Sequence, residues 1–247
     1  MCFSEKASLS MAIFGGLSSI ITYKYINIKA AMCIFYFTLM QIIHYIAYLV
    51  IDDCNNKTNQ LMSILNYYHI CFQGPVWLIG WLGIFEKYSI IKPLYLKFMP
   101  LLIGMALITS ILMALRRLNF IPLGVNTNEN KEIIRKHMVN EDINGSLQGK
   151  LCSRSGKEHI QFRVPLRTEP SYYTPNLYGH FFFFFIPFLF FNNTTRLLSL
   201  FTWVFGILIP TLYYNLESSE VATVWCFISI VQILMMYGYL IFSSKRH

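Results

Sequence analysis

The sequence predicts an all-α membrane protein, a bundle of about seven transmembrane helices with a β-hairpin in the long loop between helices 4 and 5. Hydrophobic residues make up 55% of the 247 residues and charged residues 13%, whereas soluble domains carry about 25% charged residues. The apolar residues form about seven runs, and a bilayer-spanning helix needs roughly 20 apolar residues. We therefore expect one polytopic membrane domain over 1–247, with 116–174 as an extramembrane insertion.

The apolar runs are nearly free of charge. The first could be a signal peptide, but no clear small-residue cleavage site follows it and the preceding residues are barely basic, so we predict a retained span. The fifth is short for a span. In order, the predicted spans are 7–24, 30–51, 61–85, 94–115, 176–191, 197–214 and 221–242.

Four of these runs contain a proline: Pro75, Pro100, Pro187 and Pro210. Proline lacks the backbone N–H and frees the carbonyl four residues earlier. A neighbouring helix or polar side chain must then satisfy that carbonyl in the bilayer. We expect kinked helices, which open internal cavities in some membrane proteins and have no function in others.

The polar insertion contains a hairpin pattern. Residues 147–153 and 159–164 flank the turn-like 154–157. Ile160, Phe162 and Val164 alternate with polar neighbours, which is typical of a strand. An isolated hairpin is marginally stable in water, so we expect it to pack on the mouth of the bundle.

Lysine and arginine in the short loops predict the orientation. The loops after helices one, three and five and the C-terminal tail hold most of these residues. We therefore predict an integral membrane protein with its N-terminus outside and its C-terminus cytoplasmic. Arg116 and Arg117 are exceptions, but long loops translocate largely regardless of charge.

Two of the six cysteines lie in polar segments, Cys54 and Cys152. They can pair if both face an oxidising compartment, but sequence alone does not fix connectivity. The other four lie in or beside apolar runs, where a thiol behaves as a small hydrophobe. They are Cys2, Cys33, Cys71 and Cys226.

Several functions are disfavoured by missing features. The net charge is +8, but the basic residues are not gathered on one tail or helix face, so we expect no nucleic-acid partner. The last run has no lysine for a retinal Schiff base, and no two histidines are four apart as in zinc-dependent seven-helix hydrolases. Rhodopsin-like receptor motifs and a potassium-selectivity filter are also missing.

Neutral polar side chains remain as candidates inside the spans, since no acidic or basic residue lies clearly mid-span. Helical spacing places the members of each set on one face. Interhelical hydrogen bonding is favoured over metal or haem ligation by imidazole. The two sets are Gln41, His44 and Tyr48 on helix two, and Asn66, His69 and Gln73 on helix three.

A second candidate site lies at the predicted outer mouth, where Cys2, His159 and His180 fall on the same side. An amine, a thiolate and imidazoles could bind a soft or borderline metal. The spacing of a structural zinc site is missing. An interfacial cluster without metal is favoured, and Cys2 would instead be a lipidation site if the N-terminus faced the cytoplasm.

The opening residues Met1-Cys2-Phe3-Ser4 and Ser8 resemble an uncharacterised family of multi-pass membrane proteins that begin Met-Cys-Phe-Ser-x-x-x-Ser. Looser matches follow in order at Gln41–Leu49, Glu158–Phe162 and Val224–Phe227. The chain departs from the family at His44, where a glutamate is common, and at Phe162, which replaces an aromatic hydroxyl. The resemblance implies a fold and shared positions, among them Trp225, and no reaction.

The leading hypothesis is non-enzymatic: the protein binds or passes a small ligand at the outer half of a kinked bundle in the lipid bilayer. The alternatives are a metal- or haem-dependent membrane enzyme and a structural membrane protein without a ligand. The predicted ligand-binding residues are Gln41, His44, His69, Gln73 and Trp225, and the predicted metal ligands are Cys2, His159 and His180.

Overall fold

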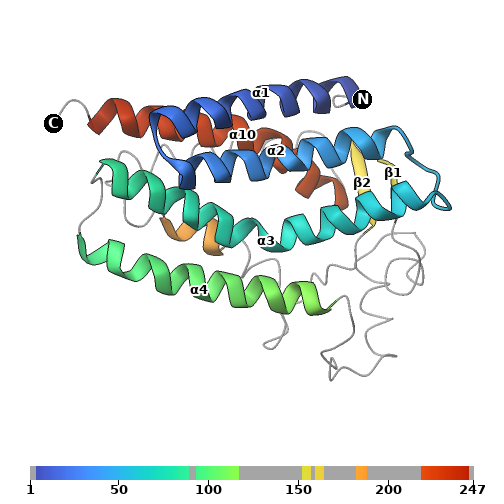
Figure 1. Ribbon diagram of the computed structural model, residues 1–247. Coiled ribbons are helices and arrows are strands. Elements are labelled where there is room, and N and C mark those ends of the chain that lie inside the picture. The colour runs from blue at the N-terminus through green and yellow to red at the C-terminus, as the bar shows by residue number, and fades with distance from the viewer. Residues whose placement is uncertain are drawn as a thin grey trace.

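The computed structural model describes residues 4–88, 93–116, 152–156, 159–163, 182–187 and 218–244. These residues form five long helices and a small antiparallel sheet (Figure 1). The helices overlap the predicted runs 7–24, 30–51, 61–85, 94–115 and 221–242, and run 197–214 lies outside the described residues. The elements are α1 Glu5–Tyr25, α2 Ile28–Tyr48, α3 Lys57–Tyr88, α4 Pro93–Arg116, β1 Cys152–Ser155, β2 Ile160–Arg163 and α10 Ser218–Ser244.

Polar side chains cap the first two helices. Ser4 precedes α1, and its side chain accepts a hydrogen bond from the backbone N–H of Ala7. Asn27 does the same for Ala30 at the start of α2. Each cap satisfies an N–H group that the first turn of a helix leaves unpaired. The cap at Asn27 lets α2 begin directly after the short turn that follows α1.

Pro75 and Pro100, two of the prolines expected to kink helices, lie inside α3 and α4, respectively. The ribbon of α3 bends along its length (Figure 1), as expected where a proline removes a backbone donor. Pro210 lies outside the described residues, and Pro187 is the last described residue of the short helical segment 182–187. Trp77 on α3 donates its indole N–H to the carbonyl of Phe184 at 3.1 Å, which fixes this segment against the bundle.

The hairpin prediction is confirmed, because β1 and β2 pair antiparallel with Ser153 opposite Phe162 and Ser155 opposite Ile160. The first strand extends two residues beyond its predicted end at residue 153, and residues 147–151 lie outside the described residues. Arg154 and Ser155, predicted as turn, belong to β1. Ser155 belongs to the strand because it pairs with Ile160 of β2, and its backbone N–H also binds Asp52 of a distant loop.

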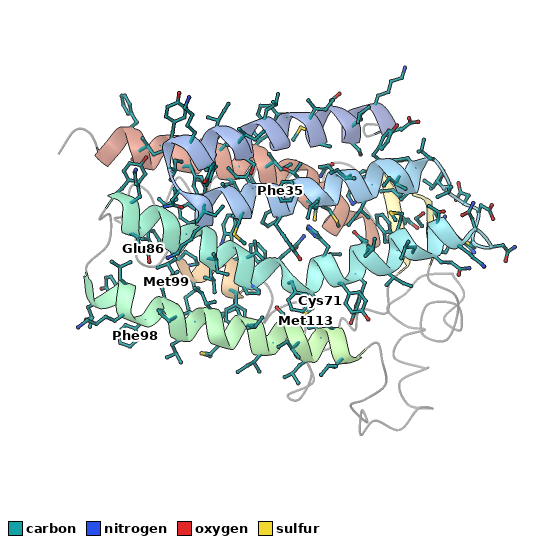
Figure 2. The ribbon with its side chains drawn as sticks, in the orientation of Figure 1. Phe35, Cys71, Glu86, Phe98, Met99 and Met113 are labelled. Atoms are coloured by element: carbon teal, nitrogen blue, oxygen red, sulfur yellow. A yellow bond between two sulfur atoms is a disulfide. The ribbon has the colours of Figure 1, made fainter. Side chains whose placement is uncertain are left out.

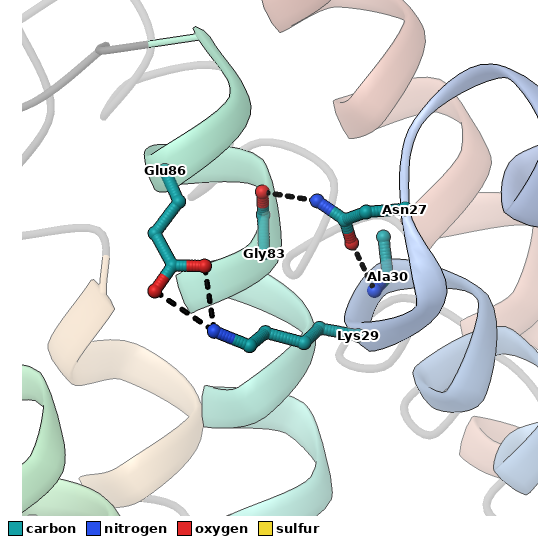
Figure 3. A network of polar contacts seen from close by, with 5 residues as sticks. All are labelled: Asn27, Lys29, Ala30, Gly83 and Glu86. Atoms are coloured by element: carbon teal, nitrogen blue, oxygen red, sulfur yellow. Dashed lines mark hydrogen bonds and ion pairs between the residues drawn. The ribbon is translucent and has the colours of Figure 1, made fainter.

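One end of the bundle, the turn end, is closed by direct contacts between α2 and α3 (Figure 3). Asn27 donates its amide N–H to the carbonyl of Gly83 at 2.6 Å, and Lys29 forms an ion pair with Glu86 at 2.6 Å. A Cβ on Gly83 would lie 2.6 Å from the Asn27 Oδ1 atom. The glycine therefore permits this close approach.

The side chains of α1 face the opposite way from those of a water-soluble helix. Every buried residue on α1 is a glycine, serine or threonine, and Ser19 bonds the carbonyl of Ala31 on α2 at 3.0 Å. The exposed residues are large and apolar, whereas soluble proteins rarely expose large contiguous apolar patches. The exposed set on α1 includes Leu9, Ile13, Phe14, Leu17, Ile20 and Ile21.

Helix α4 likewise exposes large apolar side chains. Phe98 lies on its outer side, while Met99 and Met113 face α3 (Figure 2). Among the described residues, two helices are long and apolar enough to cross a membrane, Ile28–Tyr48 and Leu94–Leu115, and only 22% of the latter is buried. Length and composition alone also suit a core helix of a soluble protein, so the seven-span count stays a prediction.

Candidate functional site

The end of the bundle opposite the turn end is the hairpin end, formed by residues 49–56, β1 and β2. Asn59, completely buried at the start of α3, joins its parts. Its amide N–H group donates to the carbonyls of Val50 at 2.7 Å and Ser153 at 3.0 Å. Its amide oxygen accepts the backbone N–H of Ser153 at 2.7 Å. One side chain thus ties β1 to the loop and to α3.

Asp52 makes a second set of contacts with β1. Its carboxylate accepts the backbone N–H of Ser155 at 2.8 Å and the hydroxyl at 2.6 Å, and its own N–H donates to Ser153. The φ angle of Asp52 is 68°, in the left-handed region that aspartate tolerates better than most residues. The carboxylate contacts favour this backbone geometry.

A disulfide joins Cys54 to Cys152, with an S–S distance of 1.94 Å and a Cα–Cα distance of 5.2 Å. The sequence left this pairing open. The two cysteines are 98 residues apart in the chain, and the folded hairpin brings them together. The loop and β1 are therefore connected covalently as well as by hydrogen bonds.

His44 lies beneath β2 and is completely buried. Phe162 stacks on its ring at 5.3 Å between centroids and 26° between planes. His159 approaches it edge to face at 5.6 Å. Neither ring nitrogen of His44 has a hydrogen-bond partner among the described residues. A buried imidazole whose two nitrogens lack hydrogen-bond partners destabilises the folded state. His44 is therefore the histidine in this region with the fewest of its hydrogen bonds satisfied.

Tyr48 positions His159 over this group. Its hydroxyl lies 2.6 Å from the Nδ1 atom of His159, and it accepts the backbone N–H of Ile160 at 3.3 Å. The two rings are also nearly parallel. Tyr48 and His44 are four residues apart on α2 and therefore lie on the same helix face. On this face, Tyr48 bonds the hairpin and His44 lies beneath it.

Deeper in the bundle, His69 is fully hydrogen-bonded. Its Nε2 atom donates to the carbonyl of Tyr36 at 2.7 Å, and the Tyr36 hydroxyl donates to the carbonyl of His69 at 2.7 Å. Because a carbonyl only accepts, the proton is on Nε2, and Nδ1 accepts the Gln73 amide at 3.4 Å. Both ring nitrogens are therefore already used by the protein.

Cys226 on α10 joins the polar faces of α2 and α3. Gln41 donates to its carbonyl at 3.1 Å, Gln73 donates to its sulfur at 3.1 Å, and Ser229 also donates to its carbonyl at 2.7 Å. The amide oxygen of Gln41 and both amide atoms of Asn66 have no partner among the described residues. Asn66 lies one turn of α3 from His69, toward the hairpin end.

The structure separates the predicted ligand-binding residues into two levels. Gln41 and Gln73 bond Cys226, and His69 bonds Gln73, while His44 lies with His159 below the hairpin. Trp225 lies in α10, and its side chain is outside the described part. Asn59 escaped sequence reasoning because the predicted span began at residue 61, although its spacing to Ser63 and Asn66 continues the same helix face.

The predicted metal ligands are only partly described. Cys2 and His180 lie outside the described residues, and His159 is buried against His44 and Tyr48. Within the described ranges, no group of three or more histidine, cysteine, aspartate or glutamate side chains could hold a metal ion. The metal site at the mouth stays a prediction.

A family model described as a family of unknown function, DUF5765, matches residues 6–244. No curated protein and no solved structure matches the chain.

Proposed function

The chain belongs to the family of unknown function DUF5765, and from that premise we propose that it is a multi-pass membrane protein that binds a small uncharged ligand beneath the hairpin. His44 carries this proposal, because it is completely buried and neither ring nitrogen has a partner among the described residues. Bound ligands or ordered water normally satisfy such groups.

The exposed faces of α1 and α4 support membrane insertion. Their large apolar residues would form an unfavourable surface in water and a favourable one against lipid. The small and hydroxyl residues buried on α1 are those that let helices approach closely in a bilayer. Lipid would therefore cover the exposed apolar side chains, and packing between helices would bury the small and hydroxyl side chains of α1.

The disulfide supports the orientation with the hairpin end outside. Disulfides form and persist in oxidising compartments and are rare in the cytosol. Figure 1 places the start of α1 at the same end as the hairpin and the C-terminal end of α10 at the other. An outside hairpin end would thus give an outside N-terminus and a cytoplasmic C-terminus, as the loop charges predict.

The chemistry of the site favours a neutral ligand. The rings of Phe162 and His159 contact His44, and Gln41 and Tyr48 share its face of α2; none of these four side chains is a carboxylate, lysine or arginine. His44 and Asn66 offer hydrogen-bond donors and acceptors, and Gln41 offers an acceptor. An amide, a nucleobase or a polyol would match these groups, whereas an ion would lose its hydration without compensation.

Purified protein in nanodiscs tests the proposal by thermal shift against amides, nucleobases, polyols, inorganic anions and metal ions. We expect a neutral compound to raise Tm, and we expect His44→Phe to abolish that rise. The control is Thr38→Val on the same helix, because the Thr38 hydroxyl already bonds the carbonyl of Ile34 at 2.8 Å. An unchanged Tm with every compound would favour a structural protein without a ligand.

The unbonded His44 imidazole also fits a second function, a metal- or haem-dependent membrane enzyme, since imidazole ligates zinc, copper and iron. Metal analysis and an absorption spectrum of the purified protein separate the two. A stoichiometric metal or a Soret band would favour the enzyme. Without either, the neutral-ligand function is retained.

A further inference from the structure

We propose that the hairpin is a lid over His44 and that reduction of the Cys54–Cys152 disulfide releases it. The inference rests on the proposed function, because it adds regulation to the same site. The two strands have different contacts: β1 is the anchor, attached to the loop and to α3, and β2 is the cover, lying on His44.

The anchor is attached mainly through polar and covalent contacts. Asn59 and Asp52 bind the backbone of β1, and the disulfide joins Cys152 of β1 to Cys54. Asp52 and its contacts are exposed, so water competes for these hydrogen bonds. The disulfide is the covalent contact between β1 and the loop, beside the buried hydrogen bonds between Asn59 and Ser153.

The cover is attached through a small apolar cluster. Ile160 and Phe162 of β2 pack with Ala47 and Met62. The Tyr48 hydroxyl links α2 to the start of β2, at His159 and Ile160. Because two short strands alone are marginally stable, β2 depends on β1, and β1 depends on its anchor.

The reduction consumes one dithiol. Its thiolate attacks the Cys54 sulfur, which is more exposed than that of Cys152, and Cys152 leaves as a thiolate that takes up a proton. The second thiol of the reductant then attacks the mixed disulfide, releasing Cys54 as a thiol. Two electrons and two protons pass to the protein, and the reductant becomes a disulfide. Arg154 lies 3.4 Å from the Cys54 sulfur and attracts the incoming thiolate.

Histidine labelling tests the lid without a ligand. Diethyl pyrocarbonate transfers an ethoxycarbonyl group to an unbonded imidazole nitrogen and releases carbon dioxide and ethanol. The full chain in nanodiscs is labelled before and after treatment with dithiothreitol, and the modified residues are identified by mass spectrometry. We expect His44 to react at least tenfold faster after reduction and to regain protection on reoxidation.

His69 is the internal control, because it is buried in the same helices and both of its nitrogens are bonded. Its labelling should not change on reduction. If His69 labels in step with His44, the whole bundle has loosened and the lid is overturned. Equal labelling of His44 in the oxidised and reduced protein also overturns it.

Two variants sharpen the result. Phe162→Ala removes the ring that stacks on His44 and should raise its labelling while the disulfide is intact. Cys54→Ser with Cys152→Ser should label like the reduced protein. If Phe162→Ala leaves His44 protected, β2 is not the cover. A lid that opens on reduction while the ligand panel fails would retain this inference and reject the proposed function.

Discussion

The two ends of the bundle are closed in different ways. At the turn end, neighbouring helices meet directly: Asn27 bonds Gly83, and Lys29 pairs with Glu86. At the hairpin end, a segment about 100 residues away in sequence is attached by a disulfide and by Asn59. At the turn end, Asn27, Lys29 and Glu86 are paired across the two helices, whereas at the hairpin end His44 has no hydrogen-bond partner among the described residues and lies beneath a separate cover. Under the proposed function, the hairpin end would bind the ligand, while the turn-end contacts hold α2 against α3.

The largest expected effect comes from the disulfide. Cys54→Ser with Cys152→Ser should lower the free energy of unfolding by about 2–5 kcal/mol, because the crosslink closes a long loop in the unfolded chain. Denaturation followed with and without reductant measures this. If the free energy of unfolding of the wild-type protein were the same with and without reductant, the hairpin end would be held in place without its disulfide.

Asn59→Ala should cost about 3 kcal/mol, because it leaves the Ser153 N–H without this partner and removes one hydrogen bond each from the carbonyls of Val50 and Ser153. Equilibrium unfolding measures the loss. Asn55→Ala, at an exposed position in the same loop, is the control and should change stability by less than about 0.5 kcal/mol. Equal effects would contradict the role of Asn59 as the junction.

At the turn-end half, Gly80→Ala should destabilise by about 1–3 kcal/mol through overpacking. A Cβ there would lie 2.5 Å from the Cβ of Cys33 and 2.8 Å from the Tyr237 hydroxyl. Gly16→Ala is the matched control, since nothing lies within 4 Å of its added Cβ, and it should be neutral or stabilising. A tolerated Gly80→Ala would mean that this half packs less tightly than the distances indicate.

His44→Phe should raise stability by about 1 kcal/mol, because it removes two unbonded buried nitrogens and keeps an aromatic ring against Phe162. Thermal unfolding without ligand checks this sign. A loss of stability comparable to that of Asn59→Ala would show that His44 is a structural group with partners, and the contrast between the two ends would disappear.

The smallest expected effect is at the ion pair. Lys29 and Glu86 are 38% and 45% exposed, so Lys29→Ala and Glu86→Ala should show a coupling of about 0.2–1 kcal/mol in a double-mutant cycle, reduced further by salt. A larger coupling would mean that the turn end depends on charge, in addition to Asn27 and close packing.

The elements that the sequence predicted well depend on neighbours in the chain. The run 30–51 became α2 because its length and apolar character are local properties. The alternation of Ile160 and Phe162 likewise predicted a strand. The shared face of Gln41 and His44 follows from helical geometry alone. The end of β1 was predicted incorrectly, because Ser155 pairs with Ile160 and is bonded by Asp52, contacts that the turn-like residues 154–157 did not reveal.

The sequence by itself determined the mostly helical fold, the hairpin and the neutral polar character of the inner faces, since each follows from local spacing and composition. The tertiary structure decided which polar groups are satisfied. Cys226 and Tyr36 complete the hydrogen bonds of Gln73 and His69, while His44 receives only aromatic neighbours. The physical reason is that a hydrogen bond requires both partners at one distance and angle, and the fold alone brings Tyr36 of α2 and Cys226 of α10 to side chains that are 33 and 153 residues away in the chain.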